Sequence, residues 1–232
     1  MDLKFSQHMQ NRCVRLVVSL SVLVGFLLII FLRDSFASID RSGNYWAITI
    51  QNTAFTDVAV IISVVFDPNV LLALSPALSI LFFRKNYRKC SLILLAGMVG
   101  TAISLLVSKM LVLSPRPPNG LITETGYSFP SGHITSGIVF FGLIAYFAWH
   151  IWNSSKTRRV TIMLFLITIA LVGFDRIYLN VHWVSDVLGG FLLGTFWLLF
   201  SILVLTYWEN ERNCKFSNNT LTKEKEPLDP IN

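Results

Sequence analysis

Two histidines, three cations, three serines and two aspartates fall within three short segments of this 232-residue sequence. The first segment reads KMLVLSPRP and contains Lys109 and Arg116, the latter lying between Pro115 and Pro117. Because prolines restrict the backbone on both sides, the guanidinium of Arg116 is held in place, which suits the binding of an anion. Lys109 has a simpler alternative, since a lysine near a helix end can extend to the membrane interface.

The second segment reads PSGH, covers Pro130 to His133, and directly precedes a long hydrophobic run. A helix N-terminus offers free N–H groups and the positive end of the helix dipole, which together favour a phosphate. Gly132 allows close approach of the backbone to an anion, and Ser131 adds a hydroxyl. Ser131 could also serve only as an N-cap, but capping does not explain His133 at the edge of an apolar segment.

The third segment reads DRIYLNVHWVSD and covers Asp175 to Asp186. His182 and Asp186 are four residues apart, so they share one face if a helix has begun by His182. A carboxylate that binds one ring nitrogen fixes the tautomer and leaves the other nitrogen free to attack or to accept a proton. Such a pair alone is also common as a simple helical contact, so its meaning depends on the other two segments.

Together the three segments supply the parts of a phosphoryl-transfer site. The cations Lys109, Arg116 and Arg176 neutralise phosphate oxygens. One histidine acts as nucleophile and the other as general acid. The sequence has no cluster of carboxylates to hold Mg²⁺, so we expect neither a metal nor another cofactor, with the cations in the metal's role.

These segments resemble the signature of the type 2 phosphatidic acid phosphatase family, K-x6-RP, PSGH and SR-x5-H-x3-D. The resemblance implies that His182 forms a phosphohistidine with Asp186 as its partner, and that His133 protonates the leaving group and later activates water. It implies phosphate binding by five residues, which are Lys109, Arg116, Ser131, Gly132 and Arg176. Members of the family act without metal on phosphatidic acid, diacylglycerol pyrophosphate, phosphatidylglycerol phosphate or polyprenyl pyrophosphates.

Two positions depart from the family's pattern. The serine before the third-segment arginine is Asp175 here, which could orient Arg176 but also brings negative charge near a phosphate. Pro118 follows Arg116-Pro117 where some members have another basic residue, so a second phosphate would be held less tightly.

The elements that position these segments are predicted to be membrane helices. The chain is 53% hydrophobic and only 14% charged, which is too few charges to cover a soluble core. We expect an all-α polytopic membrane protein with a short interfacial helix before its second span. Runs of suitable length predict six spans, at Val14–Leu32, Asn69–Phe83, Ser91–Leu113, Ile134–Trp152, Val160–Leu179 and Val184–Tyr207.

The rest of the chain is less regular. The segment Ser42–Phe66 is apolar but broken by polar residues, which is typical of an amphipathic interfacial helix, although a re-entrant segment or a seventh half-span remains open. We expect a cytoplasmic segment 1–13, a membrane domain 14–208 and a disordered cytoplasmic tail 209–232. The glycines Gly189, Gly190 and Gly194 are explained sufficiently by helix packing.

Basic residues predict the topology. With six spans, fourteen of the 19 Lys and Arg residues fall on one side, which is typical of cytoplasm, and the three segments fall on the other. Both termini are therefore expected in the cytoplasm and the site outside. The lysines and arginines on the cytoplasmic side explain the net charge of +6. We therefore expect no nucleic-acid binding. The three scattered cysteines indicate neither a zinc site nor a disulfide framework.

Three functions remain open from the sequence. The first is hydrolysis of a lipid phosphate or a lipid pyrophosphate, with a polyprenyl pyrophosphate favoured because the site faces outward. The second is transfer of the phosphoryl group to a lipid acceptor, and the third is anion binding without catalysis. The sequence gives no indication of the oligomeric state.

Overall fold

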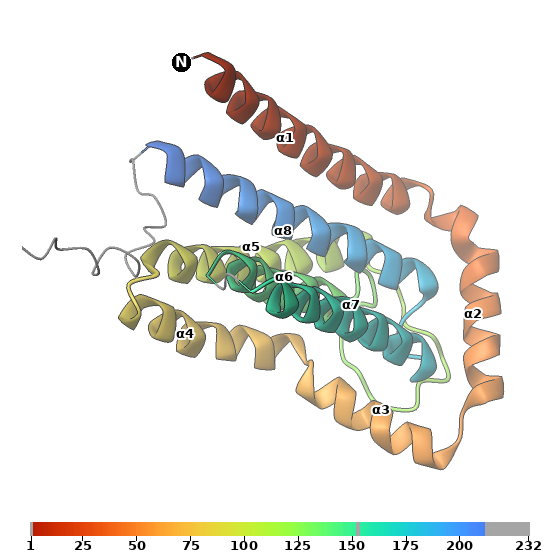
Figure 1. The fold of residues 1–232 in the computed structure, drawn as a ribbon. Coiled ribbons are helices and arrows are strands. Elements are labelled where there is room, and N and C mark those ends of the chain that lie inside the picture. Colours follow the sequence, from red (N-terminus) through yellow and green to blue (C-terminus); the bar gives the residue numbers. More distant parts are fainter. Residues whose placement is uncertain (1, 152–153, 212–232) are drawn as a thin grey trace, which may run out of the picture.

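A computed structural model describes residues 2–151 and 154–211, in which all regular structure is helical (Figure 1). The all-α prediction is therefore confirmed. The elements in chain order are α1 (Asp2–Phe31), the 3₁₀ helix η1 (Arg33–Phe36), α2 (Ala37–Ile50), α3 (Thr53–Val65), α4 (Pro68–Arg84), α5 (Arg88–Val112), α6 (Gly132–Ile151), α7 (Ser155–Tyr178) and α8 (Val184–Glu211).

Among the described residues, five helices are long and apolar enough to cross a membrane, namely α1, α5, α6, α7 and α8. The predicted second span corresponds to α4, which has only 17 residues and continues α3 at a bend of 44°. The count of six therefore holds only if α3 and α4 form one broken span. Pro68 explains the break, because it has no N–H to continue α3, and the Asp67 side chain caps the new helix by accepting from Asn69 N at 2.8 Å.

The prediction of a single interfacial helix at Ser42–Phe66 is wrong. The chain there forms the separate helices α2 and α3, which are divided at Gln51 and Asn52. Asn52 is extended and accepts from Phe55 N at 3.1 Å, so it ends one helix and caps the next. Figure 1 shows α2 running across the end of the bundle rather than along it.

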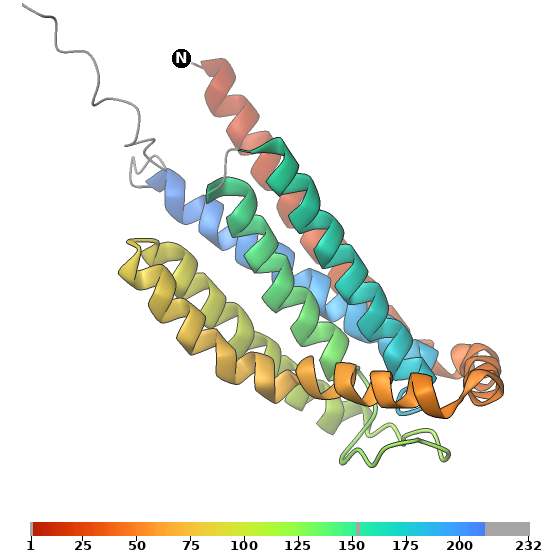
Figure 2. The same cartoon turned by 60° about the horizontal axis from the view of Figure 1, so that its bottom comes forward.

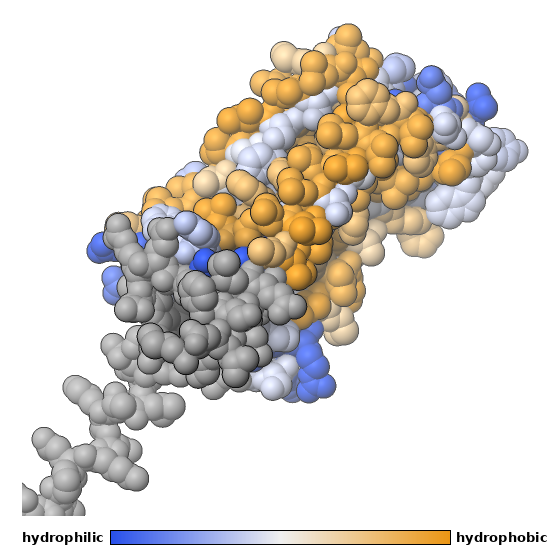
Figure 3. Space-filling view, turned by 90° about the horizontal axis from the view of Figure 1, so that it is seen from above, coloured by the Kyte–Doolittle hydropathy of each residue, from blue (hydrophilic) through white to orange (hydrophobic). Residues whose placement is uncertain are grey.

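The bundle is arranged around α6, the most buried of the five long helices. α8 packs against α1, α5 and α6, while α6 also packs against α7 and α5 against α4. Hydrophobic side chains cover much of the outer surface, and Figure 3 shows them as a broad band with hydrophilic residues gathered toward its two ends. This distribution fits a protein surrounded by lipid.

The two ends of the bundle differ. The start of α1, the end of α8 and the α4–α5 turn lie at one end, whereas α2, α3 and the long α5–α6 loop lie at the other (Figures 1 and 2). α1 begins at Asp2 and α8 ends at Glu211, so helix extends into both predicted flanking segments. The rest of the predicted tail, 212–232, lies outside the described residues.

Close contact between α6 and α8 depends on glycine. A Cβ atom at Gly194 would lie 2.9 Å from the Thr135 carbonyl oxygen and 3.0 Å from Ile138 Cβ. At Gly137, on α6, a Cβ would meet only Ile169 Cδ1, at an ordinary 3.5 Å. The two positions therefore form a matched pair for testing this interface.

We expect Gly194→Ala to lower the free energy of unfolding by about 1–3 kcal/mol, because α8 must move away from α6. Gly137→Ala, where a Cβ has room, should leave it unchanged or raise it by up to about 1 kcal/mol, because alanine has the higher helix propensity. Thermal unfolding in detergent micelles measures both. Equal stability of the two variants would contradict the close packing.

Candidate active site

The three sequence segments meet at the end of the bundle that carries α2 and the α5–α6 loop. Ser131 N donates to the Asp186 carbonyl at 3.0 Å, which joins the start of α6 to the start of α8. Leu121 N donates to the Leu179 carbonyl at 2.9 Å, which joins the α5–α6 loop to the end of α7. Backbone hydrogen bonds thus hold together segments that are far apart in the sequence.

His182 lies in the turn between α7 and α8, and its side chain is buried. The condition that a helix has begun by His182 is not met, since α8 begins at Val184, where the predicted sixth span also begins. The pairing is nevertheless formed, with His182 Nδ1 3.5 Å from Asp186 Oδ2. The same oxygen accepts from Trp183 N at 2.8 Å, so Asp186 caps its own helix and folds the turn back toward the histidine.

The other ring nitrogen of His182 faces a cation, because Nε2 lies 3.4 Å from Arg116 Nη1. Burial lowers the pKa of His182 below its usual value, the Asp186 carboxylate raises it, and the charges of Arg116 and Lys109 lower it further. The ring is therefore neutral near pH 7, as a nitrogen nucleophile must be. One nitrogen faces a carboxylate and the other faces a guanidinium.

Arg116 is held by backbone carbonyls, in addition to its flanking prolines. Nη1 donates to Val181 O at 2.9 Å, Nε to Gly126 O at 3.1 Å and Nη2 to Thr125 O at 3.2 Å. Burial lowers the pKa of Arg116 and the carboxylates of Glu124 and Asp186 oppose that shift, so the group stays charged. The prediction that Arg116 is a fixed cation agrees with this geometry.

His133 and Arg176 form a second buried pair, on the α6 and α7 side. Arg176 Nη1 lies 3.2 Å from both ring nitrogens of His133. His133 Nε2 lies 3.1 Å from the Ser63 carbonyl and 3.9 Å from Asp67 Oδ2, so the α3–α4 break borders this histidine. A carbonyl can only accept, which assigns the proton to Nε2 when that hydrogen bond forms.

The remaining predicted phosphate ligands lie in the same region. Lys109 Nζ hydrogen-bonds to the Tyr127 carbonyl in the α5–α6 loop, and its charge acts on His182. The Ser131 hydroxyl is buried at the start of α6. A Cβ at Gly132 would lie 3.1 Å from Pro68 Cγ, so packing gives a second reason for this glycine beside the predicted approach of an anion.

Comparison with known proteins identifies the family. The PAP2 superfamily model matches residues 88–210, more than half of the chain. This chain belongs to the PAP2 superfamily. The matched residues contain all three sequence segments, so the resemblance seen in them is confirmed.

Two curated proteins whose names denote phosphatases are similar to this chain over part of its length. Phosphatidylglycerophosphatase B from Bacillus subtilis is 43% identical over 75 residues, covering 32% of this chain and 37% of the relative. An undecaprenyl-diphosphatase from Sulfolobus acidocaldarius is 33% identical over 132 residues, covering 54% and 59%. The chain thus spans less than two thirds of the length of either curated relative.

A solved structure extends the likeness to almost the whole fold. The crystal structure of a transmembrane PAP2 type phosphatidylglycerolphosphate phosphatase from Bacillus subtilis superposes with a TM-score of 0.73 at 26% identity. The match covers 86% of this chain and 98% of that structure. The PAP2 fold and its multi-pass membrane character are therefore shared.

Asp175, which departs from the PAP2 pattern, lies buried against its neighbour. Asp175 Oδ2 accepts from Arg176 Nε at 2.9 Å and also contacts Arg176 Nη2. Nη1 is the guanidinium nitrogen that faces His133. Asp175 therefore orients Arg176, which is one of the two roles that the sequence left open for it.

Sequence reasoning missed three charged residues of the site. Glu124 bridges two cations, with Oε1 3.2 Å from Arg176 Nη1 and Oε2 3.5 Å from Arg116 Nη2. Arg33 Nη2 lies 2.9 Å from Asp186 Oδ1. Asp40 accepts from Ser185 N at 2.8 Å and so satisfies the start of α8. Glu124 lies on the irregular α5–α6 loop, Arg33 on the short 3₁₀ helix η1 and Asp40 on α2. None of the three belongs to a sequence segment whose spacing indicated a site.

We expect Glu124→Gln to tighten the binding of orthovanadate by about 3- to 10-fold, because the carboxylate repels an oxyanion placed between Arg116 and Arg176. Isothermal titration calorimetry measures the affinity, with Asp57→Asn on the exposed face of α3 as the charge-matched control. Unchanged or weaker binding in Glu124→Gln would mean that the two guanidinium groups do not form one anion site.

Proposed function

We propose that this chain is a membrane phosphatase that hydrolyses a lipid phosphate or a lipid pyrophosphate through a phosphohistidine on His182. The observation that carries this proposal is the environment of the two ring nitrogens of His182. Nδ1 lies 3.5 Å from the Asp186 carboxylate, and Nε2 lies 3.4 Å from the Arg116 guanidinium. The nitrogen available for attack thus points to where Arg116 would hold a phosphate.

The reaction proceeds in two steps. In the first, the Nε2 lone pair attacks phosphorus, a P–N bond forms, and the P–O bond to the lipid breaks. The imidazolium that develops is stabilised by Asp186 through Nδ1. In the second, water attacks phosphorus, the P–N bond breaks, and free phosphate leaves with His182 restored.

His133 transfers a proton in both steps. Its protonated form gives a proton to the departing lipid oxygen, and its neutral form then takes one from the attacking water. The carboxylate of Asp67 lies 3.9 Å from Nε2, where it would pair with the protonated ring. Because Arg176 Nη1 donates toward the same ring in the structure, protonation of His133 requires that this guanidinium turn to the phosphate.

Three cations take the electrostatic role that Mg²⁺ has in other phosphoryl-transfer enzymes. Lys109, Arg116 and Arg176 come from α5, the α5–α6 loop and α7, so they surround a phosphate from different directions. A charged donor fixed before the reaction stabilises the oxygens without reorganisation. The proposed mechanism is therefore independent of metal.

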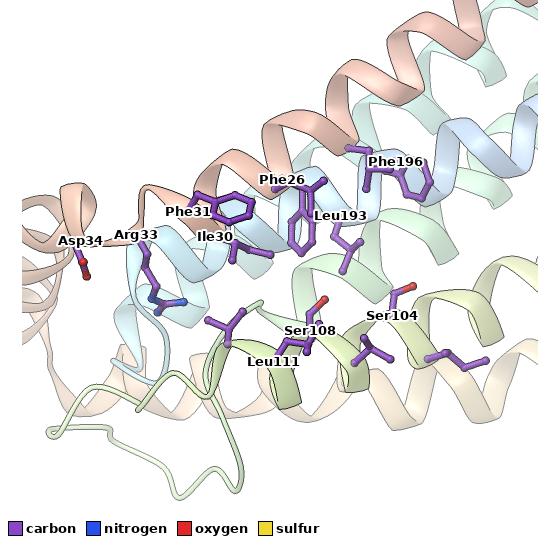
Figure 4. A pocket seen from close by; sticks show the side chains of 15 residues that line it. Phe26, Ile30, Phe31, Arg33, Asp34, Ser104, Ser108, Leu111, Leu193 and Phe196 are labelled. Carbon is purple, nitrogen blue, oxygen red and sulfur yellow. The ribbon is translucent and has the colours of Figure 1, made fainter.

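A lipid substrate is supported by an apolar groove that reaches the site. The groove has a volume of about 740 Å³ and lies between α1, α5 and α8 (Figure 4). Phe26, Ile30, Leu111 and Leu193 are among its lining residues, and Arg33 lies at the end nearest the site. A hydrocarbon chain in this groove would extend toward the end of the bundle that carries the site. The names of the relatives allow both a monophosphate and a diphosphate.

The site is proposed to face away from the cytoplasm. The basic clusters of the α4–α5 turn and the start of α7 lie at the end of the bundle opposite to the site, together with the start of α1 (Figure 1). Lysine and arginine accumulate on the cytoplasmic side of membrane proteins. Both termini are thus cytoplasmic and the phosphate is released outside.

We expect His182→Ala to lower phosphate release by about 1000-fold or more, because no other group then forms the phosphoenzyme. The assay uses protein in detergent micelles, excess chelator, and a panel containing phosphatidic acid, phosphatidylglycerol phosphate and a polyprenyl pyrophosphate. Arg41→Gln, on the exposed surface of α2, is the control for substitution near the site.

Each contrary result of this assay has a separate meaning. Activity of His182→Ala near that of wild type would overturn the role of His182. Loss of wild-type activity in chelator that Mg²⁺ restores would overturn the metal-free mechanism. A phosphorylated lipid acceptor instead of free phosphate would identify a phosphotransferase.

The orientation is tested by labelling single cysteines in a chain whose native cysteines are replaced by alanine. Asn119→Cys lies on the exposed α5–α6 loop, and Lys85→Cys lies on the exposed α4–α5 turn. In intact cells, a membrane-impermeant maleimide should label Asn119→Cys and not Lys85→Cys. The reverse pattern would place the site in the cytoplasm.

A further inference from the structure

Arg33 is the charged residue that links α1 to the site. It opens the 3₁₀ helix η1, between α1 and α2, and lies outside the residues that match the PAP2 superfamily. Figure 4 shows its side chain reaching inward from the end of α1. Its side chain is only 20% exposed, so its guanidinium is largely removed from water.

The strongest contact of Arg33 is with Asp186. Nη2 lies 2.9 Å from Oδ1, and the Asp186 side chain is fully buried. The second carboxylate oxygen, Oδ2, is the one that faces Trp183 N and His182. Arg33 therefore fixes one oxygen of the carboxylate while the other is directed to the histidine.

Two more contacts join Arg33 to the other sequence segments. Its Nη2 donates to Ser114 Oγ at 2.5 Å, two residues before Arg116. Its guanidinium lies 4.8 Å from the centre of the Phe129 ring, just before the PSGH segment. Ser114 and Phe129 are buried, so all three contacts are shielded from solvent.

We infer that Arg33 is a positioning residue for the reaction, which sets the Asp186 carboxylate against His182 and joins all three segments of the site to α1. This inference rests on the proposed function. A buried carboxylate next to a buried cation keeps its charge and its place more firmly than one that has only neutral donors. Arg33 acts through Asp186, so it needs no contact with the substrate.

The pairing also sets the electrostatic environment of His182. The charged and titratable groups that act on or near this ring are Asp186, Arg116, Lys109 and His133, and Arg33 acts through the first of them. Without Arg33, the negative charge of Asp186 is less compensated, which raises the pKa of His182. Because the nucleophile must be neutral, the acid limb of the pH–rate profile then moves to higher pH.

The test compares Arg33→Gln and Arg33→Lys with wild type on the best lipid of the panel. We expect Arg33→Gln to lower kcat by about 10- to 100-fold through misplacement of Asp186, with KM changed by less than about threefold. Arg33→Lys should recover part of kcat, because it keeps the charge but loses the planar donor pair. The acid limb of Arg33→Gln should lie at higher pH than that of wild type.

A double-mutant cycle tests whether Arg33 acts through Asp186. In an Asp186→Asn background, Arg33→Gln should have an effect on kcat smaller than about threefold, since the carboxylate that it positions is already gone. Arg41→Gln should behave as wild type in every assay. Thermal unfolding of each variant separates a loss of folding from a loss of kcat.

The contrary results are distinct. Independent effects of Arg33→Gln and Asp186→Asn, or a change confined to KM, would overturn the positioning role while leaving the phosphatase intact. Wild-type kcat in Arg33→Gln would do the same. Absence of phosphate release by wild-type protein from every lipid would overturn the proposed function and this inference with it.

Discussion

The Asp186 carboxylate is the group on which the rest of the site depends. Its two oxygens bind Arg33 and Trp183 N and face His182, while its backbone carbonyl accepts from Ser131 N. Asp186 thus contacts Arg33 just beyond the end of α1, the start of α6 and the turn that carries His182. A buried carboxylate is destabilising unless it is paired, so these partners are needed for folding as well as for chemistry. The proposed catalytic arrangement and the closure of the bundle at this end therefore share one interaction.

The charges of the site are arranged in alternating order. Arg33 pairs with Asp186, and Glu124 bridges Arg116 and Arg176. Arg176 also pairs with Asp175. Without a substrate, this order keeps several buried cations compensated by carboxylates. In the proposed site, a phosphate that enters would compete with Glu124 for two guanidinium groups, so its binding would exchange one anion for another of higher charge. Such an exchange suits a site at the end of a membrane bundle, where uncompensated charge is strongly destabilising.

Much of this arrangement could be predicted from the sequence, and the reasons for success and failure are physical. Long apolar runs predicted five of the spans, because lipid requires continuous hydrophobic helices. Motif spacing predicted His133, His182 and Asp186 at one end, since helix ends bring such segments together. The α2–α3 break was missed because it depends on one capping side chain, Asn52. Glu124 and Arg33 were missed because loops and short 3₁₀ turns have no periodicity that aims a side chain.

The central claim is that His182 carries the phosphoryl group, and trapping that intermediate tests it most directly. Wild-type protein is incubated briefly with ³²P-labelled lipid phosphate and quenched in alkali, in which an N-linked phosphate survives. We expect an acid-labile, alkali-stable label on the peptide that contains His182 in the wild-type protein. The variant His182→Gln, which keeps Asp186, should carry no such label. A label on another residue, or turnover by wild type with no trapped label under conditions that slow the second step, would contradict it.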